Sequence, residues 1–310
     1  MNQTTETDIL SRARRVRPWQ ELGINVREAK DSAAAIKLAG LDWEVHQSPV
    51  RYYDDTQERV IDSLKVNYRA DTGDALGVVT NRYTVVQNQT VFEFADRLVD
   101  DGLQYDMAGS IQDGRKVWLE AYLPQIKILD DSFDPYLFFV NGHDGKSAIL
   151  VYMSPVRVTC SNMLTPELRS AIRRWYLPHV RTVQQKMIDA RRTLKLAGKY
   201  MDELKWRAET LVSAKLGRND LRRFVEKMFP AMDTDRKNNR IKREIERFRN
   251  CYFEDDLENF KGTKWGLLLA VSDFITHKPL RTTRQRERHF DQMLEGHELL
   301  NMAYSLINTM

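Results

Sequence analysis

Cysteine is scarce in this sequence. Cys160 and Cys251 are its two cysteines among 310 residues, and neither belongs to a Cys-x-x-Cys or Cys/His ligand spacing. The pattern therefore excludes a disulfide framework and a zinc site of the usual spacing. We expect no bound cofactor, because no other motif requires one.

Long apolar runs are also missing. The first 25 residues contain no signal-peptide core, and no window approaches the roughly 18 apolar residues of a membrane-spanning helix. We expect a cytoplasmic protein without a membrane partner. Glycine (14) and proline (9) are few, which argues against long disordered segments. A chain of this length with 42% hydrophobic residues can bury one large or two medium cores.

Charge is unevenly distributed along the chain. Residues 1–150 hold 17 Lys and Arg against 24 Asp and Glu, a net charge of −7, whereas residues 151–310 hold 31 against 20, a net charge of +11. A basic half of this kind favours a polyanionic partner, because each contacted phosphate releases counterions. Solvated helix faces are the alternative explanation.

The first half of the chain has the pattern of a hairpin sheet. Two Asp-Gly dipeptides, at 113–114 and 144–145, favour the positive φ angles of tight turns and predict two hairpins. Short helices are expected over 27–40 and 89–101. Alternating apolar and β-branched residues predict further strands at 43–48, 59–69, 75–79 and 83–87.

From Thr165 onward the apolar spacing becomes helical. We predict an α+β fold of two domains: an antiparallel hairpin sheet with short helices over 1–164, and a basic, mostly helical domain over 165–310. The helices expected in the second domain lie at about 182–216, 220–229, 238–253, 263–276 and 287–308.

Residues 141–164, NGHDGKSAILVYMSPVRVTCSNML, contain fragments of several catalytic motifs. Gly145-Lys146-Ser147 matches the end of a phosphate-binding P-loop, but Val140 occupies the first glycine position, so the motif fails. Cys160 with a histidine base is a possible nucleophile. A buried cysteine ending an apolar strand is the commoner explanation.

A group of carboxylates leaves open a metal-dependent nuclease. Asp106 or Asp113, followed by Glu120 on the next strand, has the residue types that bind a catalytic metal ion. However, Tyr122 stands where the lysine of a Glu-x-Lys motif is expected. The nuclease is therefore kept as an alternative.

Basic and aromatic residues cluster after the second hairpin. A basic groove with aromatic faces is what holds single-stranded nucleic acid without sequence preference. The residues that we predict to contact phosphates are Arg157, Arg169, Arg173, Arg174, Arg181 and Lys186, with Arg82, Arg115 and Lys116 on earlier strands. Trp175 and Tyr176 are the predicted stacking faces, although either residue can also fill a core.

Several longer segments resemble a known family. They are AGLDWEV (39–45), TGDALGVVTNRYTVVQNQTVFEFADRLVDDG (72–102), AGSIQDGRKVWLEAYLP (108–124), the stretch 141–164, and KWGLLLAVSDFITH (264–277) with its following basic run. The chain resembles the phage/plasmid-like proteins grouped as domain of unknown function 932. This resemblance implies a mobile element in a bacterial host. By architecture alone, a hairpin sheet leading into a long basic helix is similar to Rad-type single-strand annealing proteins.

We therefore expect a non-enzymatic, homo-oligomeric protein of a phage or plasmid that binds single-stranded nucleic acid, DNA rather than RNA. Strand annealing in recombination or replication is the expected activity. We expect a ring or filament, because the acidic half of one protomer can meet the basic half of the next. Two alternatives stay open: a mobile-element protein that binds a host factor in counter-defence, and a metal-dependent nuclease.

Overall fold

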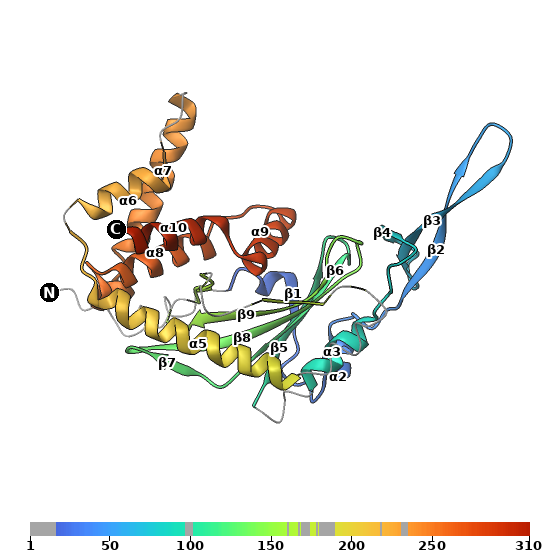
Figure 1. The fold of residues 1–310 in the computed structure, drawn as a ribbon, viewed down its shortest axis with the longest axis horizontal. Coiled ribbons are helices and arrows are strands. Elements are labelled where there is room, and N and C mark those ends of the chain that lie inside the picture. The colour runs from blue at the N-terminus through green and yellow to red at the C-terminus, as the bar shows by residue number, and fades with distance from the viewer. Residues whose placement is uncertain are drawn as a thin grey trace.

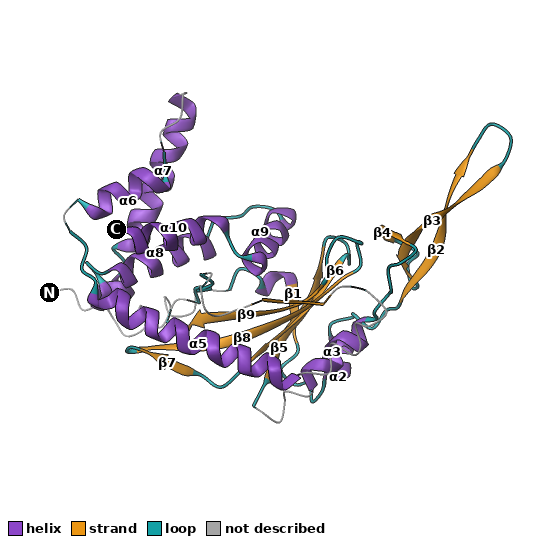
Figure 2. Cartoon of the chain, in the orientation of Figure 1, coloured by secondary structure: helices purple, strands orange, loops and turns teal. Residues whose placement is uncertain are grey.

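The computed structural model has an antiparallel sheet half and a helical half, which confirms the predicted α+β class (Figures 1 and 2). The residues that it describes are 17–96, 102–159, 161–166, 168, 174–177, 179, 190–217, 219–230 and 235–310. Within them, no helix is long and apolar enough to cross a membrane.

The larger sheet has the strand order β1-β5-β6-β8-β9-β10, with the short β7 paired to β8, and every pairing is antiparallel. Both predicted Asp-Gly hairpins are confirmed, because they join β5 to β6 and β8 to β9. Gly114 and Gly145 have φ angles of 83° and 78°, which glycine adopts without a Cβ clash. The strands are β1 (Gly23–Asn25), β5 (Gln104–Ile111), β6 (Lys116–Tyr122), β7 (Ile126–Ile128), β8 (Asp131–Gly142), β9 (Ile149–Arg157) and β10 (Arg174–Leu177).

The smaller sheet forms a projecting arm, made of β2 (Val45–Tyr53), β3 (Glu58–Arg69) and β4 (Ala75–Thr80). Strand β4 pairs with the base of β3 only, through the residues Leu64 to Tyr68. The outer part of the arm is therefore a two-stranded ribbon that reaches away from the body (Figure 1).

Helices make up most of the second half. The expected final helix at 287–308 is wrong in one respect: it is two helices, because Gly296 with φ 97° interrupts it. The helices are α2 (Ser32–Leu38), α3 (Asn88–Asp96), α5 (Ala190–Ser213), α6 (Asp220–Met228), α7 (Asp235–Tyr252), α8 (Lys264–Thr276), α9 (Thr283–Glu295) and α10 (Glu298–Thr309), with 3-10 turns η1 (Gln20–Leu22) and η3 (Asp255–Phe260).

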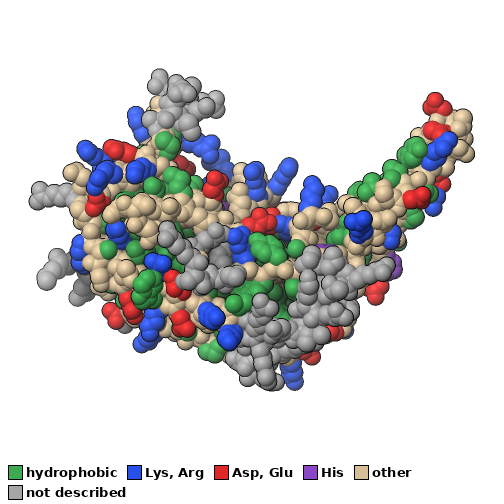
Figure 3. Space-filling model, viewed as in Figure 1, with side chains coloured by type: hydrophobic (Ala, Val, Ile, Leu, Met, Phe, Trp, Pro, Cys, Tyr) green, Lys and Arg blue, Asp and Glu red, His purple; other side chains and the backbone are tan. Residues whose placement is uncertain are grey.

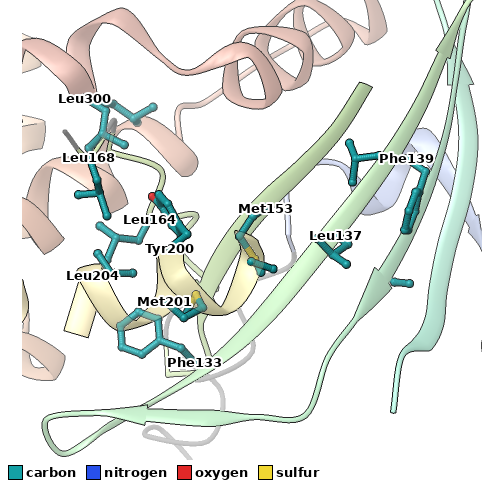
Figure 4. Packing of buried hydrophobic residues seen from close by; sticks show 14 of the residues in the cluster. Phe133, Leu137, Phe139, Met153, Leu164, Leu168, Tyr200, Met201, Leu204 and Leu300 are labelled. Carbon is teal, nitrogen blue, oxygen red and sulfur yellow. The ribbon is translucent and has the colours of Figure 1, made fainter. Parts of the chain in front are cut away.

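The larger sheet is buried on both faces, which explains its nearly continuous apolar strands. On one face, α5 contributes Tyr200, Met201 and Leu204 to a core with sheet residues such as Phe133 and Met153 (Figure 4). The other face is covered from η1 and α9 by a second cluster that includes Trp19, Trp118, Phe138 and Phe290. The core beneath α5, which we call the first core, includes residues from both halves of the chain. Strand β10 adds residues beyond position 164 to the larger sheet.

The turn between β8 and β9 joins the arm to the body. Its Asp144 backbone lies so close to Gly77 of β4 that a Cβ on Gly77 would be 2.5 Å from the Asp144 carbonyl oxygen. In addition, the Asn67 side chain donates a hydrogen bond to the His143 carbonyl at 2.9 Å, and Tyr83 donates to the Gly142 carbonyl at 2.9 Å. The turn made of His143, Asp144, Gly145 and Lys146 therefore docks the arm onto the body.

A buried polar network supports this turn. Asn141 donates to the Val86 carbonyl and to the Asn88 side chain, which also lies 2.9 Å from Nε2 of His143. Burial lowers the pKa of His143 to about 3, so its ring is neutral at pH 7.

The strand expected at 83–87 is wrong, because backbone groups of this segment bond to Asn141 and to the carbonyl of His179.

We expect the Gly77→Ala variant to lose about 1–3 kcal/mol of unfolding free energy, because the new methyl group overpacks the junction between the sheets. Urea unfolding followed by tryptophan fluorescence measures the change. Gly198→Ala on α5 is the matched control, because nothing lies within 4 Å of its Cβ position. That control is expected to be neutral or slightly stabilised. Equal stability of both variants would contradict this account of the junction.

Candidate nucleic-acid interface

A concave surface lies between the helical part and the arm. Helix α7 rises at one end of it and the β2–β3 ribbon at the other, with α9 and the hairpin turns of the larger sheet between them (Figure 1). The space-filling view shows this face hollowed, with Lys and Arg side chains gathered along its edge (Figure 3). We call this face the concave face.

The connection between α8 and α9, together with the first half of α9, supplies a dense basic group. Lys278, Arg281, Arg284 and Arg288 are exposed, and Arg240 of α7 is exposed as well. Within the described residues, none of these five side chains has an ion pair. They are therefore available to an external anion. We call these five residues the basic wall.

The packing of α9 directs two of these cations, Arg284 and Arg288, outward. Thr282 caps the helix, and its capping box with Gln285 satisfies the first amide groups. On the inner side of α9, Phe290 packs on Trp19 with ring centroids 6.0 Å apart, and Met293 and Leu294 join the same cluster. The arginines occupy the opposite, solvated side of an amphipathic helix.

Two residues predicted to contact phosphates are enclosed by the protein. Arg157 at the end of β9 is only 1% exposed, and it forms ion pairs with Asp131 at 2.8 Å and Asp256 at 2.7 Å. Lys116 is also buried, and it pairs with Asp291 of α9 at 2.6 Å. We remove both from the predicted phosphate contacts, because a bound strand would have to displace carboxylates that already neutralise them.

Residues Arg174, Trp175 and Tyr176 lie on β10 at the edge of the larger sheet. Trp175 is half-buried against the first core, which matches its alternative reading as a core residue. Tyr176 is 57% exposed, so its ring can be reached by a ligand. The Arg174 guanidinium donates to the Glu295 carbonyl at the end of α9 and lies over the Tyr176 ring.

The remaining predicted contacts divide into two groups. Arg82, after β4, and Arg115, in the β5–β6 turn, are exposed. The other four, together with Cys160, lie outside the described residues; they are Arg169, Arg173, Arg181 and Lys186.

Two of the three carboxylates of the nuclease alternative lie side by side inside the protein. A β-bulge at Asp106 directs its side chain toward Glu120 on β6, and both carboxylates are fully buried. Arg17 lies 2.7 Å from Asp106 and 2.9 Å from Glu120, and Arg27 lies 2.6 Å from Asp106. Asp113 is exposed in the β5–β6 turn and does not join them. Among the described residues, no three His, Cys, Asp or Glu side chains are grouped to hold a metal ion.

The two buried carboxyl groups have opposite pKa shifts. Complete burial raises the pKa of Glu120 to about 8, despite hydrogen bonds from Arg17 and Trp19. Burial alone would raise the pKa of Asp106 as well, but Arg17 and Arg27 lower it below its usual value. At neutral pH, Asp106 is therefore the charged partner of the two guanidinium groups.

The raised pKa of Glu120 predicts a pH dependence of stability. Between its ordinary pKa of 4.5 and about 8, the folded protein binds a proton that the unfolded chain has lost. The contribution of Glu120 to the free energy of unfolding is fully present below pH 4.5. It falls as the pH rises from 4.5 through 8, with a slope of at most about 1.4 kcal/mol per pH unit. We expect wild type to lose stability relative to Glu120→Gln between pH 5 and pH 8. Urea unfolding of both proteins measures this, and parallel curves would contradict it.

Neither the basic wall nor the arm is among the residues predicted from the sequence to form the candidate interface. The run from Lys278 to Arg288 is visible in the sequence as five cations with one acid, Glu287. Its amphipathic pattern, with apolar residues at 290, 293 and 294, was the signal that could have identified it. Arg240 could not be joined to this run from sequence, because α7 and α9 meet only through folding.

The chain matches a model of a known protein family. A family model described as a domain of unknown function, DUF932, matches residues 75–294. This span includes β4, most of the larger sheet and the helices through most of α9. It confirms the family resemblance noted in the sequence. Comparisons with curated proteins and with solved structures give no match.

Proposed function

The chain belongs to the DUF932 family, and we propose that this member binds single-stranded nucleic acid across its concave face and promotes annealing of complementary strands. The observation that carries the proposal is the basic wall. Five exposed cations without an ion pair among the described residues come from α7, the α8–α9 connection and α9, which border the concave face (Figure 1), and three of them line one pocket. Such a group attracts a polyanion and releases its condensed counterions.

The arm supplies the aromatic part of the proposed interface. Tyr53, near the tip of the ribbon, is 77% exposed, and its neighbour Tyr52 is 47% exposed. Exposed tyrosine rings provide flat faces on which bases of any sequence can stack. The basic wall runs from α7, at one end of the concave face, to α9 in its middle, and the arm forms the other end, so a strand that crosses the face reaches both (Figure 1).

Annealing requires no catalytic side chain. Two complementary strands repel each other through their phosphates, and a basic surface that neutralises one strand lowers this repulsion. A non-enzymatic activity of this kind suits recombination or replication in a phage or plasmid, which the family resemblance implies. We propose DNA as the substrate and a homo-oligomer as the active form, because annealing long strands needs many protomers along one strand.

The direct test is binding of a fluorescent single-stranded DNA, measured by anisotropy at several salt concentrations. We expect affinity to fall steeply with salt, with a slope of about 0.7 for each phosphate contacted on a single strand. Acceleration of the annealing of two complementary oligonucleotides tests the activity. Sedimentation measures the oligomeric state with and without DNA. Absence of salt-dependent binding would overturn the proposal. If a host protein co-purifies instead, the counter-defence alternative is favoured. Cleavage of the DNA that depends on magnesium would favour the nuclease alternative.

Base stacking on the arm gives a separate prediction. We expect Tyr53→Ala to weaken single-stranded DNA binding by about tenfold, because one stacked base contributes roughly 1–3 kcal/mol. Tyr53→Phe keeps the ring and should bind like wild type. The measurement is the same anisotropy titration, with Tyr68→Phe at the base of β3 as a control for general effects on the arm. Equal losses in the Ala and Phe variants would exclude stacking.

A further inference from the structure

A pocket of about 460 Å³ lies between α7 and α9 and is lined by residues of the basic wall. Arg240 comes from α7, Lys278 from the connection after α8, and Arg288 from α9. His289 and Gln292 of α9 complete the part of the lining used below. The pocket is therefore built by three segments that are distant in sequence.

Positive charge dominates this pocket. Its one acidic lining residue is Glu244, which pairs with Arg247 at 3.0 Å. Arg240, Lys278 and Arg288 have no ion pair within the described part of the chain. Three cations around one small space attract a compact anion with more than one negative charge.

A buried histidine gives a second, independent indication of a ligand. His289 is only 4% exposed, and its Nε2 has no hydrogen-bond partner among the described residues. Burial, helped by the neighbouring His297, lowers the pKa of His289 to about 4, so its ring is neutral in the unliganded protein. A buried polar atom without a partner costs free energy, which a ligand's hydrogen bond would recover.

We propose that this pocket binds a phosphate monoester, either at the phosphorylated end of a nucleic-acid strand or on a free nucleotide. A monoester carries close to two negative charges at neutral pH, whereas an internal phosphodiester carries one, so the monoester balances more of the three cations. The volume is in the range of small-ligand sites and can hold a nucleotide unit with its phosphate. The strand-end form of the proposal rests on the proposed function; the nucleotide form does not.

The test compares three ligands on the full-length protein: a 12-nucleotide DNA with a 5′-phosphate, the same DNA with a 5′-hydroxyl, and thymidine monophosphate. We expect the phosphorylated strand to bind about tenfold more tightly than the hydroxyl strand, which corresponds to one additional charge-assisted contact. Anisotropy measures the strands, and calorimetry measures the mononucleotide.

Variants on a single helix separate the pocket from the surrounding surface. Arg240→Gln is expected to remove the preference for the phosphorylated end, and Arg243→Gln, three residues along the same helix and outside the pocket lining, is expected to keep it. His289→Gln should also reduce the preference, with thermal unfolding recorded to confirm that the variant is folded.

The outcomes distinguish this pocket from the proposed function. Binding of thymidine monophosphate without strand binding supports the pocket, identifies a free nucleotide as its ligand and overturns the proposed function. Equal binding of both strands without mononucleotide binding overturns the pocket and leaves the proposed function intact. If Arg243→Gln loses the preference for the phosphorylated strand as Arg240→Gln does, the pocket proposal is also overturned. The preference would then depend on the total positive charge of the surface and not on the pocket.

Discussion

Replacing Arg281, Arg284 and Arg288 with Gln is expected to weaken single-stranded DNA binding about 100-fold near 0.1 M salt, because three phosphate contacts each contribute about 0.7 to the salt slope. The slope itself should fall by about 2. All three side chains are exposed on the basic wall, so the substitutions leave the core of α9 untouched. Anisotropy titrations at four salt concentrations measure both quantities.

The matched control removes the same charge from another surface. Lys195, Lys199 and Lys205 are exposed on α5, which crosses the larger sheet away from the concave face (Figure 1). Their triple Gln variant is expected to change affinity by less than about threefold, through the net charge alone. A similar loss of affinity in both triple variants would show that binding follows total charge and has no defined surface.

Replacing Arg17 with Met is expected to destabilise the protein by about 3–5 kcal/mol, the usual cost of removing one partner from a buried ion pair. The guanidinium of Arg17 is the group that contacts both Asp106 and Glu120. Without it, the buried carboxylate of Asp106 keeps one partner, Arg27. Urea unfolding at pH 7 measures the loss.

Two further variants make this prediction specific. Arg27→Met is expected to cost less, because the Arg27 side chain is 56% exposed and its charge is largely solvated. The double variant Arg17→Met with Asp106→Asn should recover part of the loss, because the unpaired charge is removed with its partner. Equal effects of Arg17→Met and Arg27→Met would contradict a buried network centred on Arg17.

The same network explains why Asp106 and Glu120 were ambiguous in the sequence. Carboxylates on adjacent strands suit a metal site, but they suit a buried ion pair equally well. The partner that distinguishes the two arrangements, Arg17, is 89 residues before Asp106 in the sequence. No local pattern connects them, and only the packing of η1 against the sheet brings them together.

Local features were predicted well because they depend on short stretches of chain. Each Asp-Gly dipeptide lies in the turn of a hairpin, and its glycine has the positive φ angle that the turn requires. Helices α6 and α7 follow the apolar spacing of their own residues, whereas α8 is a nearly continuous apolar run that is buried on all sides. By contrast, the expected strand at 83–87 has β-branched residues but no strand beside it, so its backbone bonds elsewhere.

The sequence by itself determined the α+β class, the two hairpins, the excess of positive charge in the second half and the family. Only the tertiary structure decided which cations can meet a ligand. In the sequence, nothing distinguishes Arg157 and Lys116 from Arg281 and Arg288 as candidate phosphate contacts. In the fold, however, Arg157 and Lys116 pair with carboxylates contributed by η3 and α9. The physical reason is that a charge is neutralised by whatever the fold places within a few ångströms of it, and those neighbours are set by contacts between distant segments.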